Sequence, residues 1–123
     1  MTTPSTLKSG RIVDSKRNRR RFPRYRLDVL LRLNVLHDNQ YLHTMGRTSD
    51  LAHGGLGCVL PMELQPDEVV NLELCLPEIG EPLLLRAVVR YRRGLSYGLE
   101  FLGPTVDQQQ QIDLACAGLV LVQ

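Results

Sequence analysis

The fold is decided by a stretch of alternating apolar and polar side chains, Tyr25-Arg26-Leu27-Asp28-Val29-Leu30-Leu31-Arg32-Leu33-Asn34-Val35. Its odd-numbered positions are all apolar, and its even-numbered positions are polar except for Leu30. A period of two residues over this length predicts one long strand with a buried face and a solvated face. The polar residues 37–40 follow it and predict a hairpin turn.

The same alternation returns five times further along the chain, which predicts strands over 41–49, 55–60, 70–76, 83–92 and 97–102. We expect a bulge at Gly46 and a connection over 50–54. Six short strands joined by tight turns favour an antiparallel sandwich or barrel. We favour the barrel, because its closure leaves no strand edge exposed in so small a domain.

The last part of the chain has helical rather than strand periodicity. Thr105 and Gln108 have the spacing of a capping box, directly after Pro104. Ile112, Ala115, Cys116, Leu119 and Val120 then follow at helical spacing. These positions predict a C-terminal helix whose apolar stripe packs on the barrel. Other apolar residues, such as Leu114, lie off this stripe, and they predict either a cap on one barrel end or a homodimer contact.

Charge is distributed very unevenly along the chain. Residues 1–26 carry nine Lys or Arg and one Asp, whereas residues 27–123 carry six Arg and twelve acids, so +8 and −6 give the overall +2. Residues 1–18 also lack hydrophobic periodicity, and we expect a flexible basic N-terminal arm there. We assign 19–123 to a single mainly β domain: the six-stranded antiparallel β-barrel with its C-terminal α-helix.

The cysteines and the hydropathy indicate a cytoplasmic protein. Cys58, Cys75 and Cys116 lie in apolar stretches, without the close spacing of a zinc site, and we expect all three to be buried and reduced. The first ten residues contain no apolar run typical of a signal peptide. The longest apolar stretch near the end, 114–122, is too short to span a bilayer.

Two short segments carry the binding chemistry. The first is a dense arginine run, in which Arg19, Arg20, Arg21 and Arg24 can clamp phosphates and stack on bases. The second is Asp50-Leu51-Ala52-His53-Gly54-Gly55, between two predicted strands. Its carboxylate can accept from a guanine edge, and its glycines allow a ligand to approach the backbone. Taken singly, each feature also fits a solvated loop or an ordinary turn.

Taken together, the two segments resemble the signature of the PilZ domain family. Arg20-Arg21-Phe22-Pro23-Arg24 matches its arginine motif, although Arg17 to Arg21 has the same spacing. The segment 50–55 matches its second motif, and 97–102 looks like its closing strand. The resemblance covers about residues 17–120. It implies a six-stranded barrel with a C-terminal helix, which binds the bacterial second messenger cyclic di-GMP and folds the arginine loop over it.

The resemblance also assigns roles to individual residues. Arg20 and Arg24 would grip phosphates and guanine, Asp50 would read a guanine edge, and Gly55 would keep the approach open. Arg19 and Arg21 would assist. The family has a serine where this chain has Ala52. The missing hydroxyl removes a hydrogen bond worth about 0.5–1.5 kcal/mol, so the expected loss of affinity is roughly tenfold or less.

Other functions are less well supported by the sequence. An adaptor that has lost the ligand and binds an unidentified protein partner stays open, because of Ala52 and the apolar helix. A nucleic-acid-binding barrel is weaker, since the body of the domain is acidic and aromatic residues make up 5% of the chain. We find no nucleophile elbow, phosphate loop or metal-ligand spacing, and we therefore expect a non-enzymatic protein without metal or cofactor.

Overall fold

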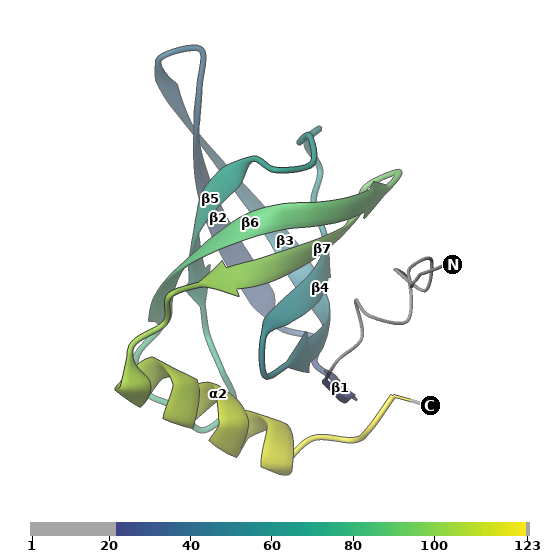
Figure 1. Ribbon diagram of the computed structural model, residues 1–123, viewed down its shortest axis with the longest axis vertical. Helices are drawn as coiled ribbons and strands as arrows, with labels where there is room; N and C mark the ends of the chain where they lie inside the picture. Colours follow the sequence, from purple (N-terminus) through teal and green to yellow (C-terminus); the bar gives the residue numbers. More distant parts are fainter. Residues whose placement is uncertain (1–21, 123) are drawn as a thin grey trace, which may run out of the picture.

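The computed structural model describes residues 22–122, and Figure 1 shows their arrangement. The elements, in chain order, are β1 (Arg24–Arg26), β2 (Leu30–His37), β3 (Gln40–Ala52), β4 (Gly55–Val59), β5 (Val69–Leu74), β6 (Leu83–Arg93), β7 (Ser96–Leu102) and α2 (Val106–Ala117). The predicted arm, residues 1–18, and its boundary at residue 19 lie outside the described residues.

Six of the strands form a closed barrel. Antiparallel pairing runs in the order β3-β2-β5-β6-β7-β4, and β4 pairs with β3 to complete the ring. This confirms the predicted mainly β fold, a six-stranded antiparallel barrel with a C-terminal helix. The β2–β3 hairpin projects beyond the other strands at the top of Figure 1, while α2 lies across the opposite end of the barrel.

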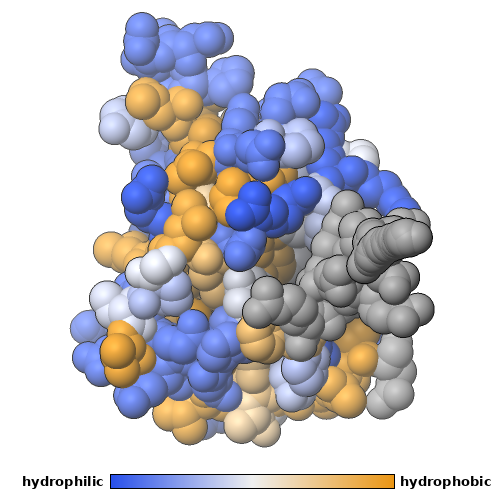
Figure 2. Space-filling view, in the orientation of Figure 1, coloured by the Kyte–Doolittle hydropathy of each residue, from blue (hydrophilic) through white to orange (hydrophobic). Residues whose placement is uncertain are grey.

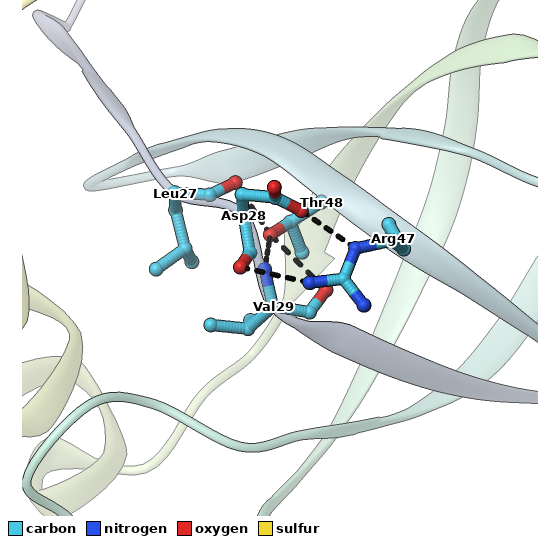
Figure 3. A network of polar contacts seen from close by, with 5 residues as sticks. All are labelled: Leu27, Asp28, Val29, Arg47 and Thr48. Carbon is cyan, nitrogen blue, oxygen red and sulfur yellow. Dashed lines mark hydrogen bonds and ion pairs between the residues drawn. The ribbon is translucent and has the colours of Figure 1, made fainter.

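The predicted strand 25–35 is wrong in one respect, because it is divided into β1 and β2. Arg26 pairs with Asp50 and Leu30 pairs with Arg47. The segment from β1 to β2 therefore has one residue more between these paired positions than β3 has. The Thr48 side chain fills the break: its hydroxyl donates to Leu27 O at 2.6 Å and accepts from Val29 N at 3.0 Å (Figure 3). A buried polar side chain thus replaces the missing ladder bonds.

The predicted connection over 50–54 is also wrong, because β3 continues to Ala52 and only His53 and Gly54 turn the chain. The bulge expected at Gly46 instead lies between Thr48 and Asp50, where Ser49 is the extra residue. Gly46 is required for a different reason. A Cβ atom there would lie 2.2 Å from the carbonyl oxygen of Val59, so the neighbouring backbone leaves no space for a side chain.

The core consists mainly of aliphatic side chains from every barrel strand, among them Leu31, Leu51, Leu72 and Val89, together with the aromatic rings of Tyr97 and Phe101. The helix closes one end of this core with Ile112 and Cys116, its buried residues. The capping box is confirmed, with Gln108 N donating to Thr105 Oγ1 at 3.1 Å. The helix ends at Ala117, however, and Leu114 is 71% exposed, so its outer apolar residues are not part of the core.

Two of the three cysteines are buried as expected. Cys58 and Cys116 lie in the core, and burial raises the pKa of the Cys58 thiol to about 12. Cys75 is exposed, which corrects the prediction. It directly follows β5 at a position between the buried Leu74 and Leu76, and the alternation therefore directs it to the solvent.

Candidate functional site

The bulge at Ser49 sets the direction of the side chains that follow it. After this extra residue, Leu51 is fully buried in the core, while Asp50 lies on the opposite, outer side of the strand and is 7% exposed. Asp50 lies beside Gly57 on β4, where a Cβ atom would be 2.8 Å from its Oδ2 atom. The bulge therefore places a carboxylate on the outer face of the barrel, next to a strand position without a side chain.

Arg24 covers this carboxylate. Its Nη2 atom donates to Asp50 Oδ2 over 2.6 Å, and the Ser49 hydroxyl donates to the same oxygen at 3.4 Å. The two side chains of the ion pair are 24% and 10% exposed. The hydrogen bond to Asp50 raises the pKa of Arg24, and burial opposes it with a smaller effect. Arg24 is thus a fixed positive charge with donor groups left for a ligand.

A row of four paired positions crosses the outer face from Asp50, and its two central positions are glycines. Asp50 pairs with Gly57, Gly57 with Gly98, and Gly98 with Tyr91. Both central glycines are buried, Gly57 beneath the side chains of Ser49 and Asp50 and Gly98 beneath the Tyr91 ring, so the absence of their own side chains lets these neighbours lie flat across β4 and β7. We call these four residues the glycine row. It connects an acidic end at Asp50 to an aromatic end at Tyr91.

Tyr91 is the site residue that the sequence analysis missed. Strict alternation along 83–92 places it inside, but a second bulge between Val89 and Tyr91 turns it to the outer face, where it is 39% exposed. Its ring occupies the space above Gly98, since a Cβ atom there would lie 2.0 Å from the ring. An ionised Tyr91 hydroxyl would lie close enough to raise the pKa of Arg24, which indicates that the two side chains are neighbours.

Ala52, Gly54 and Gly55 lie on the side of the site towards the β3–β4 turn. Ala52 pairs with Arg24 on one side and with Gly55 on the other, so it shares the outer face with the ion pair. A Cβ atom on Gly55 would lie 2.1 Å from the carbonyl oxygen of Leu99. Gly55 is therefore required by strand packing itself. Gly54 is in the turn, and its carbonyl accepts from Phe101 N at 2.9 Å.

Of the predicted site residues, the structure brings Arg24, Asp50, Ala52 and Gly55 together on one face, with Gly54 at its margin. Arg19, Arg20 and Arg21 lie outside the described residues. On the other side of Asp50 there is a shallow hollow of about 420 Å³, lined by Arg26, Leu27, Asp28, Ser49, Asp50 and Val122. Asp28 is held at its rim by Arg47, whose Nε donates to its carboxylate at 2.6 Å (Figure 3).

Residues 22–122 contain neither a candidate metal site nor a membrane-spanning helix. No group of three or more His, Cys, Asp or Glu side chains in this part of the chain can hold a metal ion. The described chain also contains no helix that is both long and apolar enough to cross a membrane. The arginine–aspartate pair and the glycine row are the features that these residues offer for binding a planar anionic ligand.

Comparison with known proteins identifies the family. The model of the PilZ domain family matches residues 18–118, most of the chain, and the chain therefore belongs to this family. A search of curated proteins gives no significant match.

Solved structures of two PilZ domains share the fold. The PilZ domain of CeSA from a cellulose-synthesizing bacterium is 20% identical, with a TM-score of 0.60, over 77% of this chain and 95% of that one. The PilZ domain of YcgR from Escherichia coli, solved with c-di-GMP, is 21% identical, with a TM-score of 0.60, over 82% and 91%.

Proposed function

We propose that this chain is a cyclic di-GMP receptor without catalytic activity, which binds the dinucleotide on the outer face of the barrel. The proposal draws on membership of a c-di-GMP receptor family and on the likeness to a domain solved with this ligand. The observation that carries it is the Arg24–Asp50 pair at one end of the glycine row.

Each residue of the site has a distinct role in this proposal. Arg24 binds phosphate or guanine with the donors that Asp50 leaves unused, and Arg19, Arg20 and Arg21 add further positive charge. Asp50 accepts from the donor edge of a guanine. Its hydrogen bonds with residues 22–122 use Oδ2, and we assign its other oxygen to the base. Tyr91 supplies a ring on which a base stacks, and the small side chain of Ala52 leaves the approach open.

Binding would then order the basic arm, residues 1–18, on the barrel domain, residues 19–123, and change the surface presented to a downstream protein. The body of the domain is acidic and the arm strongly basic, so phosphates that neutralise the arginines favour this movement. We propose a cytoplasmic location, where the three free cysteines stay reduced.

Calorimetric titration with cyclic di-GMP tests the proposal. We expect Arg24→Ala and Asp50→Ala each to weaken binding about ten- to hundredfold, since a hydrogen bond to a charged group is worth about 1.5–3 kcal/mol. Tyr91→Ala should have a smaller effect of the same sign. Arg32→Ala is the matched control, because it removes another surface arginine, paired with Glu73 away from the site. Equal affinity in all four variants would disprove the proposed site.

An adaptor that binds protein without the nucleotide is the second candidate. The observation in its favour is the exposed apolar surface. Leu114 and Leu121 are exposed at the helix end, and Val69 and Leu84 on the strands. Figure 2 shows hydrophobic residues in the middle of the visible face, over β5 and β6. Absence of any heat with cyclic di-GMP at a large excess would favour this adaptor, and analytical ultracentrifugation would show whether the same surface forms a homodimer.

A further inference from the structure

His53 connects three parts of the molecule that are distant in sequence. It lies in the turn between β3 and β4, inside the second binding motif. On one side its ring packs against Phe22, with centroids 4.7 Å apart and planes inclined by 42°. On the other side its Nδ1 atom lies 2.8 Å from Asp113 Oδ1 on α2. The contacts form a path from the helix to the segment that leads into Arg24.

The helix holds this histidine with two side chains, one turn apart. Asp113 and Gln109 are four residues apart and project from the same face of α2. Gln109 Nε2 donates to the His53 carbonyl at 2.9 Å and to Asp113 Oδ1 at 3.1 Å. The Nδ1 atom of the His53 ring lies 3.1 Å from the same Gln109 Nε2 atom. Backbone and ring of His53 are therefore both fixed to the helix.

Phe22 is placed by this arrangement. Its ring lies against His53 and also against Gly54, where a Cβ atom would be only 3.3 Å from it. Pro23 follows at once and restricts the backbone between Phe22 and Arg24. The position of the Phe22 ring is thus transmitted over two residues to the arginine that covers Asp50.

Beneath these contacts the packing is incomplete. A hollow of about 250 Å³ is lined by Pro23, Tyr25, His53, Asp113, Cys116 and Ala117. Close packing alone therefore does not hold residues 22–23, the segment before β1, against the helix. Beyond the helix, Val120 O accepts from Arg26 N and Val122 N donates to Arg24 O, both at 2.8 Å. The helix and its tail hold the arginine-bearing strand at both of its ends.

We infer that His53 is a positioning residue for the ligand site: fixed by Asp113 and Gln109, it serves as the platform on which Phe22 sets the location of the arginine segment. The inference rests on the proposed function for its effect on affinity. The positioning of Phe22–Tyr25 is a property of the ligand-free chain, however, and can be measured without any nucleotide.

The test combines amide hydrogen exchange of residues 22–25 in the free protein with calorimetry of cyclic di-GMP binding. We expect His53→Ala to speed exchange in this segment at least tenfold and to weaken binding several-fold. His53→Phe keeps a ring for Phe22 and should restore part of both losses. His43→Ala is the control, since this exposed histidine contacts Asn34 on the distant hairpin.

Unchanged exchange at residues 22–25 in His53→Ala would overturn the inference, whatever happens to affinity. So would equal losses in His53→Ala and His53→Phe, because the ring would then have no positioning role. If the unaltered protein does not bind cyclic di-GMP, the proposed function fails. The exchange data then decide on the positioning role alone: faster exchange in His53→Ala with partial recovery in His53→Phe supports it, and any other pattern rejects it.

Discussion

At the scale of single residues, Ala52 is the departure from the family pattern that bears most directly on affinity. It pairs with Arg24 across the strands and lies on the same outer face as Asp50. We expect Ala52→Ser to bind cyclic di-GMP up to about tenfold more tightly, because one added hydrogen bond is worth about 0.5–1.5 kcal/mol. Calorimetry measures the change. A loss of affinity with an unchanged melting temperature would show that the pocket requires alanine.

The buried thiol of Cys58 leads to a second prediction for a single residue, which concerns the free energy of unfolding at alkaline pH. Burial, and secondarily the charge of Asp50, raises its pKa to about 12 from 9.0. The unfolded thiol loses its proton from pH 9 upward while the folded one keeps it. Its contribution to stability is therefore complete below pH 9 and is lost as the pH rises towards 12, at about 1.4 kcal/mol per unit.

Chemical denaturation at pH 8 and pH 10 measures this effect. Cys58→Ala should show a smaller decrease in unfolding free energy between the two pH values than the unaltered protein, by about 1 kcal/mol. Cys75→Ala is the control, since Cys75 is exposed. We compare the decrease in unfolding free energy between the two pH values, because the cavity left by Cys58→Ala also lowers the absolute stability. Equal decreases in both variants would refute the assignment.

At the scale of the elements, the break between β1 and β2 depends on Thr48. Its side chain is buried and satisfies Leu27 O and Val29 N. Thr48→Val keeps the shape and removes the hydroxyl, which leaves the buried Leu27 O and the half-buried Val29 N without this partner. We expect a loss of about 1–3 kcal/mol in the free energy of unfolding. Thr44→Val on the same strand is the control, and an equal loss there would contradict the explanation.

The elements also show how far sequence can predict this molecule. The alternation of side chains was sufficient for the barrel and the capping box for the helix start, because both signals are local. The two motifs predicted that Arg24 and Asp50 lie close together, and the ion pair between them shows this proximity. The bulges at Ser49 and Arg90 were not predicted, since one extra residue leaves no local signal and depends on the partner strand. Tyr91 was missed for this reason. One sequence signal for the position of Tyr91 was available: Gly98, its partner on the next strand, has no side chain and leaves space for the ring.

For the molecule as a whole, we expect cyclic di-GMP to change the state of the basic arm. Trypsin cleaves after the arginines and lysines of residues 1–21, and we expect cyclic di-GMP to slow cleavage in 17–21 at least tenfold. The same ligand should not protect Arg93, next to the β6–β7 turn. Mass spectrometry of the early fragments gives the rates. Equal cleavage with and without ligand would exclude ordering of the arm.

The central claim is that cyclic di-GMP binds the outer face along the glycine row, between Arg24–Asp50 and Tyr91. An NMR titration of the ¹⁵N-labelled protein tests it most directly, because each glycine reports its own environment. We expect the amide signals of Gly55, Gly57 and Gly98 to shift in a saturable manner, while those of Asp38 and Asn39, in the β2–β3 turn, stay in place. Saturable shifts confined to other faces, or no shifts at all, would contradict it.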